Sequence, residues 1–344
     1  MTNHDISALI ATKEYDFLRT NPHLQGKIIF LTLGGSHAYG TNVEGSDVDV
    51  RGCALNSRSD ILGLTNFEQV IDNATDTTVY AFNKLIPLLL NCNPNVIEML
   101  GCRPDHYVMM TDIGQQMIKN RKIFLSQRAV SSFGGYANQQ LRRLENALVH
   151  DRLPQPKQEE YMRKAVERAI EDFGSKNPVL PKGAIRLYTA DSSREEYERE
   201  VFCDIDLKKF PLRDLRGLIN ETTNIIGNYD KLNGRNKKKD EPHLNKHAMH
   251  LVRLYLMCLD ILEKEEIVTY RESDHDMLME IRNGKYMNPD GSYQQEFFDM
   301  VDALEKRMQY AKANTALPKS PNMKHVEEFV MNVNLKAVAS EQLN

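Results

Sequence analysis

The chain lacks several features that would each point to a particular class of protein. It has no tryptophan, and its five cysteines are widely spaced with no Cys-x-x-Cys pair, which argues against a zinc site. Scattered single thiols are typical of a reducing compartment, so we expect a cytoplasmic protein. The hydrophobic run at residues 85–90, among the longest in the chain, is far too short to span a membrane, and the first residues carry no basic-then-apolar secretion signal. We therefore expect no membrane partner.

A strong excess of charge of either sign is also missing. The 44 Lys and Arg residues and the 48 Asp and Glu residues leave a net charge of −4. Attraction of nucleic acid by the whole surface is therefore not indicated, and any such binding needs a local patch. Hydrophobic residues make up 41% and charged residues 27% of the chain, as in ordinary globular proteins. Its 344 residues allow two domains with a sizeable core.

The chain does contain a glycine–serine turn directly after a short apolar run. Residues 27–33 predict a buried strand that ends at Gly34 and Gly35. Ser36 suits the N-cap of a helix that begins near His37. Glycine lets the backbone approach a ligand closely, and the start of a helix presents free N–H groups. We therefore predict that this turn receives a triphosphate tail, with the Ser36 hydroxyl as a further donor.

Two aspartates follow the turn at a spacing of two residues. On a strand, Asp47, Asp49 and Arg51 share one face. Neighbouring carboxylates repel each other, and the arrangement is costly unless a cation lies between them. Mg²⁺ (or Mn²⁺) suits this position, because it is bound by one or two carboxylates together with substrate phosphates. Asp-x-Asp alone is common on solvated strand edges, so it is the combination with the glycine–serine turn that predicts Asp47 and Asp49 as metal ligands.

These residues resemble the signature of the nucleotidyltransferase superfamily typified by DNA polymerase beta, in which Gly-Ser is followed by Asp-x-Asp. The fuller strings at 35–40 and 46–52 resemble a narrower group, the RNA-ligase-associated predicted nucleotidyltransferases. Residues 151–240 depart most from its pattern. Looser matches extend to about residue 285 and comprise Asp76, Tyr80, Lys84, Asn93-Pro94, Glu98-Met99-Leu100, Gly135-Tyr136-Ala137, Lys246, His250-Leu251, Arg253-Leu254 and Ile281-Arg282-Asn283-Gly284.

The resemblance implies an α+β fold with a polymerase-beta-type catalytic domain and a small mixed sheet. We place this domain at residues 1–125 and a mainly helical domain, which binds substrate or nucleotide, at 126–344. The motif positions are then expected to contact the nucleotide. They are Gly35, Ser36, His37, Tyr39 and Arg51.

The superfamily usually has a third carboxylate on a later strand. Asp76 is the candidate, with Asp72 as its rival. A catalytic Asp76 would act as general base on an acceptor hydroxyl or as a shared metal ligand. The alternative is that Asp76 is the N-cap of a helix that starts near Thr77.

Two groups of basic residues are further candidates for binding phosphate. Lys246, His250 and Arg253 are spaced at i, i+4 and i+7 on a helix predicted over 241–262, and so lie on one face. They could hold the triphosphate, or they could be a solvated basic stripe. The loop at 230–240 has the densest positive run in the chain, and it could equally be an exposed loop without a ligand.

From these observations we expect a metal-dependent nucleotidyltransferase. An acceptor hydroxyl would attack the α-phosphorus of a nucleoside triphosphate, and pyrophosphate would leave. An RNA end is the acceptor that the family suggests. The alternatives are nucleotidylation of a protein or small molecule, and a non-catalytic nucleotide-binding module that regulates a partner. The sequence leaves the base, the acceptor and the oligomeric state open.

Overall fold

The computed structural model describes residues 3–150, 155–176, 180–193, 198–220, 222–223, 241–289 and 292–341. The chain forms two compact units, and the first is built from two separate segments, Met1–Arg142 and Asn245–Asn344. The second unit is Arg143–Leu244. The functional division at residue 125 stays a prediction. Among the described helices, none has the length and apolar character needed to cross a membrane.

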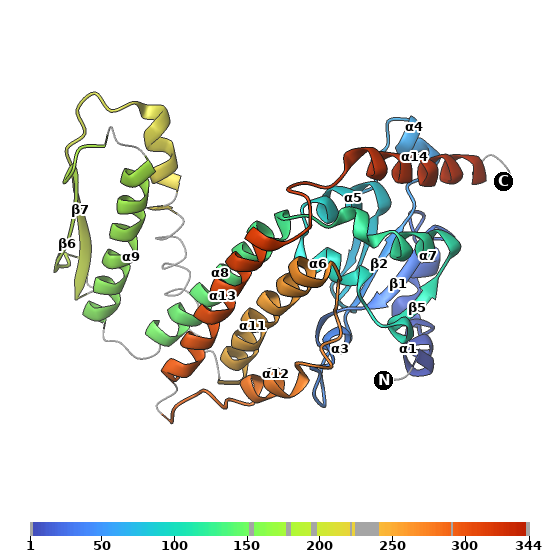
Figure 1. The fold of residues 1–344 in the computed structure, drawn as a ribbon, viewed down its shortest axis with the longest axis horizontal. Coiled ribbons are helices and arrows are strands. Elements are labelled where there is room, and N and C mark those ends of the chain that lie inside the picture. Colours follow the sequence, from blue (N-terminus) through green and yellow to red (C-terminus); the bar gives the residue numbers. More distant parts are fainter. Residues whose placement is uncertain are drawn as a thin grey trace. The chain divides into compact units, whose positions relative to one another are not determined.

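The first unit contains a mixed five-stranded sheet with the strand order β3-β4-β2-β1-β5 (Figure 1). β2 and β4 run parallel, whereas the other neighbouring strands are antiparallel. All six residues of β1 are buried, as expected for an apolar, β-branched run at the centre of a sheet. The strands are β1 Ile28–Leu33, β2 Val50–Ala54, β3 Gln69–Asp72, β4 Thr77–Ala81 and β5 Tyr107–Met110.

Several helices pack against strands of this sheet, and the mixed α+β class predicted from the sequence is confirmed. The α-helices that begin in the first segment are α1 Asn3–Ile10, α2 Phe17–Thr20, α3 Gly35–Tyr39, α4 Arg58–Leu62, α5 Phe82–Leu90, α6 Pro94–Ile97, α7 Asp112–Lys119 and α8 Arg128–His150. Short 3₁₀ turns lie at Lys13–Tyr15, Glu98–Leu100, Pro104–His106 and Arg121–Phe124. The sequence did not predict α4, which begins in a capping box between Ser57 and Asp60.

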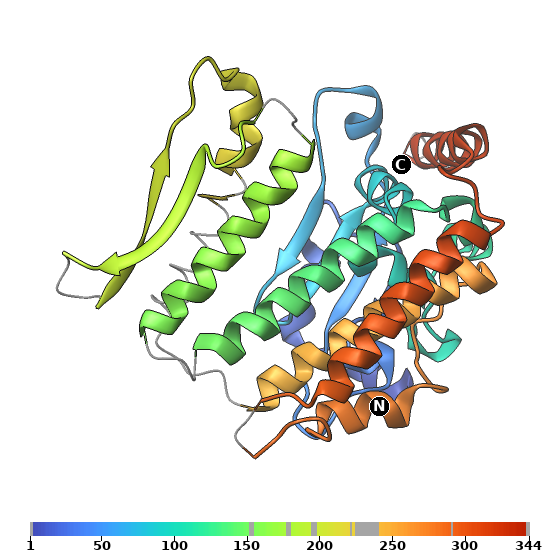
Figure 2. The same ribbon diagram turned by 60° about the vertical axis from the view of Figure 1, so that its left-hand side comes forward.

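Within the first unit, parts of three long helices lie side by side (Figures 1 and 2). They are α8 up to Arg142, α11 Glu241–Lys264 from Asn245 onward, and α13 Gln295–Asn314. The other helices of the C-terminal segment are α12 His275–Arg282 and α14 Met323–Ser340. The helix predicted over 241–262 is confirmed. Its apolar face is buried and includes Leu244, Ala248, Leu251, Tyr255, Cys258 and Leu262.

The second unit pairs one long helix with a two-stranded ribbon (Figure 2). α9 Gln155–Lys176 packs on the antiparallel strands β6 Ile185–Asp191 and β7 Arg199–Ile205. Tyr188 and Phe202 face each other across the strands, and their rings stack at a centroid distance of 5.8 Å. The predicted basic loop at 230–240 lies outside the described residues.

Candidate functional site

Parallel pairing of β2 and β4 brings two of the predicted aspartates together. Val50 pairs with Thr77 at the start of both strands, so the preceding residues, Asp49 and Asp76, lie side by side at the same edge of the sheet. The Val50 amide donates to the Asp76 carbonyl at 3.3 Å. Two strands that start together therefore place two carboxylates next to each other, although 27 positions separate them in the sequence.

The backbone at Asp76 excludes the helix-cap alternative. Thr77 opens strand β4, not a helix, so the N-cap interpretation is wrong. Asp76 has a φ of +44°, a left-handed conformation that Asp tolerates better than most residues. Its rival Asp72 instead closes the turn between β3 and β4. The Asp72 carboxylate accepts hydrogen bonds from the Thr75 amide at 2.9 Å and the Thr75 hydroxyl at 2.8 Å.

Arg51 joins the two carboxylates through one guanidinium. Its Nη2 donates to Asp49 Oδ1 and to Asp76 Oδ1, each at 3.1 Å. Its Nη1 donates to the carbonyls of Val50, at 3.0 Å, and of Asp76. The arginine thus neutralises the carboxylate pair and is itself anchored on the backbone.

The two carboxyl groups titrate as a pair. Burial, together with a hydrogen bond to Asp76, raises the pKa of Asp49 to about 6. The same hydrogen bond, with help from Arg51, lowers the pKa of Asp76. Opposite shifts are expected when two acids share a proton, because one keeps it and the other holds the charge. The positive charge of Lys246, on α11, lowers the pKa of both groups, so this exposed lysine acts on the acidic pair.

The glycines after β1 let these side chains lie directly against the backbone. Gly35 has a φ of +55°, and a Cβ placed on it would lie 1.8 Å from Asp49 Oδ2. A Cβ on Gly34 would lie 2.9 Å from Cγ of Arg51. Only glycine satisfies both the conformation and the space at position 35. The predicted glycine–serine turn and the carboxylate are therefore direct neighbours.

The helix after the turn differs from the prediction. Gly34, not Ser36, is the N-cap of α3, and no side chain caps it. The helix begins at Gly35, one residue before Ser36, so Ser36 lies inside it. α3 has only five residues, too few for a useful helix dipole. His37 lies in the same helix, and its Nε2 is 3.3 Å from the Ser46 carbonyl.

Tyr39 and Arg253 belong to a separate, buried cluster around Glu98. The Tyr39 hydroxyl donates to Glu98 Oε2 at 2.7 Å, and Arg253 Nη1 lies 3.4 Å from the same oxygen. The Arg253 guanidinium stacks 3.6 Å from the centroid of the Tyr39 ring. Tyr39 is only 4% exposed and Arg253 only 5%. A direct contact of either side chain with a nucleotide would require this cluster to open.

His250 joins the same cluster and carries no charge at neutral pH. Its ring lies edge-on to Tyr39 at a centroid distance of 6.3 Å. Burial lowers the pKa of His250 well below 6.5, and nearby positive or titratable groups lower it further. These groups are Arg253, Lys246, His247 and Arg282. Of the three residues predicted to form a cationic face, only Lys246 therefore presents its charge to the aspartates.

The sequence identified Glu98 as part of a motif but did not predict its role in this cluster. The signal was present, because Glu98 stands in an apolar run and is itself buried, and a buried carboxylate needs a partner. Two more residues hold the same region from the C-terminal segment. The Arg271 amide donates to the Tyr39 carbonyl at 3.0 Å, and Arg282 Nη1 donates to the Thr41 carbonyl.

The donor set partly fits a hard divalent cation. Asp49 Oδ2 faces the bare backbone of Gly35, in space that a Cβ would fill, and carboxylate oxygens are the ligands that Mg²⁺ prefers. Asp47 lies in the exposed loop before β2. Within the residues that the structure describes, no group of three or more His, Cys, Asp or Glu side chains is arranged to hold a metal. The carboxylates thus have the right chemistry for such an ion, but the described residues assemble no complete set of ligands for it.

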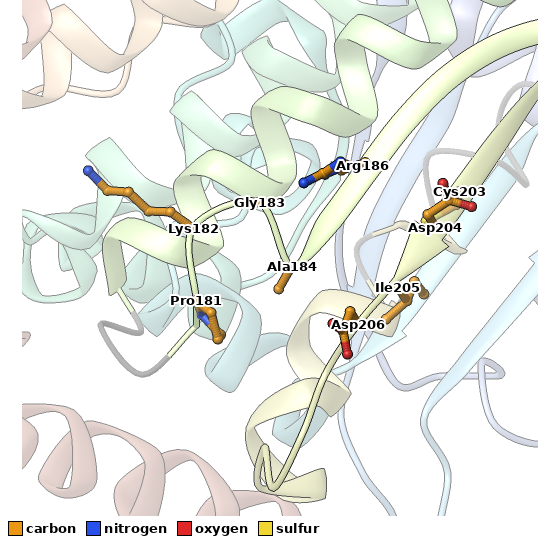
Figure 3. A pocket seen from close by; sticks show the side chains of 9 residues that line it. All are labelled: Pro181, Lys182, Gly183, Ala184, Arg186, Cys203, Asp204, Ile205 and Asp206. Atoms are coloured by element: carbon orange, nitrogen blue, oxygen red, sulfur yellow. The ribbon is translucent and has the colours of Figure 1, made fainter.

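A surface hollow lies in the second unit, away from all predicted site residues in the sequence (Figure 3). It forms between the turn before β6 and the end of β7. Lys182 and Arg186 line it together with Asp204 and Asp206. Side chains of both signs of charge line the hollow, and we assign it no role.

Comparison with known proteins matches part of the chain to one family model. Residues 9–164 match the family model described as the RNA repair pathway DNA polymerase beta family (RlaP), which confirms the family resemblance predicted from the motifs. The matched range includes Gly35, Asp49, Arg51 and Asp76. Searches of curated proteins and of solved structures gave no match.

Proposed function

We propose, on the premise that residues 9–164 carry an RNA-repair-type polymerase beta domain, that the chain is a metal-dependent nucleotidyltransferase. The family supports a nucleotidyltransferase-type role. The observation that carries the finer proposal is the contact of Asp49 with Gly35, beside Asp76. The glycine turn, one aspartate of Asp-x-Asp and the candidate third carboxylate are neighbours there, which supports the proposal. Mg²⁺ or Mn²⁺, a nucleoside triphosphate and an RNA end are the proposed cofactor, donor and acceptor.

Asp47 and Asp49 would hold the divalent ion, which when bound supplies positive charge to the reacting phosphate. The open backbone at Gly35, the Ser36 hydroxyl and the Lys246 ammonium bind the β- and γ-phosphates. The acceptor oxygen forms a bond to the α-phosphorus, the bond from that phosphorus to the bridging oxygen breaks, and pyrophosphate leaves. Positioning and charge neutralisation provide most of the rate acceleration in such transfers.

Asp76 is suited to orient the acceptor hydroxyl. Its side chain is 60% exposed and adjoins Asp49, and its lowered pKa keeps it ionised. It accepts the hydrogen bond of the incoming hydroxyl and takes its proton as the new bond forms. Because the pKa of Asp76 is low, this residue contributes more to the reaction by orienting the hydroxyl than by its affinity for the proton.

A transfer assay with α-³²P-labelled triphosphates tests the proposal. Label is expected on total RNA in the presence of Mg²⁺, and Asp49→Asn is expected to reduce transfer at least about 100-fold. Asp302→Asn is the matched control, because Asp302 pairs with Lys306 on the surface of α13 and should leave transfer unchanged. Label on protein or on a small molecule would support nucleotidylation instead. Absence of label with every triphosphate would refute catalysis and favour the binding module.

A further inference from the structure

One side of the Asp49–Asp76 pair is already taken by a cation that belongs to the chain. Nη2 of Arg51 lies 3.1 Å from one oxygen of each carboxylate. A divalent ion that bridged the same two oxygens at about 2.0–2.1 Å on the side of the guanidinium would overlap this nitrogen. On that side, Arg51 and a bridging ion therefore exclude each other.

Arg51 is also fixed too firmly to act as a temporary counter-ion. Nη1 bonds to the backbone carbonyls of Val50 and Asp76, so departure of the side chain would break contacts to four oxygens. Its stem packs against Gly34, where a Cβ would lie 2.9 Å from Cγ. The strands themselves hold the guanidinium in place, because Val50 and Asp76 are joined by a backbone hydrogen bond.

Polymerase-type sites commonly use two metal ions, about 3.5–4 Å apart, to stabilise the attacking and the leaving oxygen. We propose that in this protein Arg51 replaces the ion on the acceptor side, so that the site loads a single divalent ion at Asp47 and Asp49. This inference rests on the proposed function. The guanidinium supplies a permanent positive charge beside Asp76, and it cannot be removed by chelation or by low metal concentration.

Arg51 is then a positioning residue rather than a nucleotide-binding one. All of its described hydrogen bonds run to Asp49, Asp76 and Val50, which orients Asp76 for the acceptor. Lys246 is an exposed cation available to the triphosphate, because its side chain has no hydrogen bond or ion pair among the residues that the structure describes. Arg51 thereby supports activation of the acceptor, and Lys246 supports binding of the triphosphate.

Mn²⁺ titration followed by electron paramagnetic resonance tests this inference without reference to turnover. The full-length wild-type protein is expected to bind one Mn²⁺ per chain with an uncoupled six-line spectrum, and Asp49→Asn should lose it. Arg51→Gln vacates the bridging position and should gain a second Mn²⁺, which is recognised by spin coupling between two close ions. Arg307→Gln is the matched control, because it also breaks an arginine–carboxylate pair, with Glu263, and it should keep one uncoupled ion.

A spin-coupled pair in the wild-type protein would overturn the inference while supporting the proposed function. A single ion in both wild type and Arg51→Gln would also overturn it, because the arginine would then not exclude the second ion. No bound Mn²⁺ in either protein would refute the metal site itself, and with it the metal dependence of the proposed function. If circular dichroism shows that Arg51→Gln does not fold, the wild-type spectrum decides by its coupled or uncoupled form.

Discussion

Gly35→Ala adds one methyl group at the point where the glycine turn meets the carboxylate. Position 35 has a φ of +55°, and the new Cβ would lie 1.8 Å from Asp49 Oδ2. Real Cβ atoms essentially never approach other atoms closer than 3.0 Å, so the carboxylate must move by about 1 Å or more. The substitution therefore perturbs both the backbone and the site.

The two effects have different magnitudes and can be separated. A left-handed alanine costs about 1–2 kcal/mol, which lowers the melting temperature by roughly 2–8 °C for a unit of this size. A shift of about 1 Å in a catalytic group can reduce the rate about 100-fold. Gly26→Ala isolates the first effect, because Gly26 has a φ of +69° with nothing within 4 Å and precedes the opposite end of β1.

The assay compares both variants by thermal unfolding, Mn²⁺ affinity and nucleotidyl transfer. Both should melt at a similarly reduced temperature, but only Gly35→Ala should lose Mn²⁺ binding and transfer. Equal transfer by the two variants would refute the argument that Asp49 must lie against a bare backbone. A larger loss of stability in Gly26→Ala than in Gly35→Ala would contradict the claim that a side chain at position 35 strains the backbone and displaces Asp49.

Two further predictions concern the buried cluster around Glu98. Tyr39→Phe removes a hydrogen bond to a buried carboxylate and should lower the free energy of unfolding in urea by about 1.5–3 kcal/mol. The control Tyr310→Phe, at a residue that is 71% exposed, should leave this free energy unchanged. Equal stabilities of the two variants would refute a structural role for the Tyr39 hydroxyl. The folded-state pKa of His250 lies well below the usual 6.5, so the stability that depends on its neutral form is complete above about pH 6.5 and is lost as the pH falls below that value. Wild type should therefore lose about 1 kcal/mol more than His250→Gln between about pH 7.5 and 5.5, and parallel losses would show that His250 does not titrate differently on folding.

The local parts of the site could be predicted from the sequence, because they depend on neighbouring residues. A β-branched apolar run before two glycines predicts β1 and its end, and Asp-x-Asp leads directly into β2. Asp76 was a candidate only through the family resemblance. Its position beside Asp49 depends on the parallel pairing of β2 with β4, and no local pattern specifies which strands pair.

The cationic face predicted on α11 shows the other limit of sequence reasoning. Helical spacing correctly places Lys246, His250 and Arg253 on one side of the helix, but spacing does not reveal what that side packs against. Glu98, 155 positions from Arg253, and Tyr39 take the arginine into the interior. Lys246, one turn before His250, keeps its charge at the surface. Burial decided the role of each residue, and burial is a property of the whole fold.

The split construction of the first unit has a consequence during synthesis. A ribosome adds about 5–20 residues per second, so roughly 8–30 s pass between the translation of Glu98 and that of Arg253, 155 positions later. Until then the glutamate has no guanidinium to pair with, and burying it alone would be strongly unfavourable. The N-terminal segment that carries the signature is thus synthesised first, but the buried cluster around Glu98 forms only after α11 has been translated.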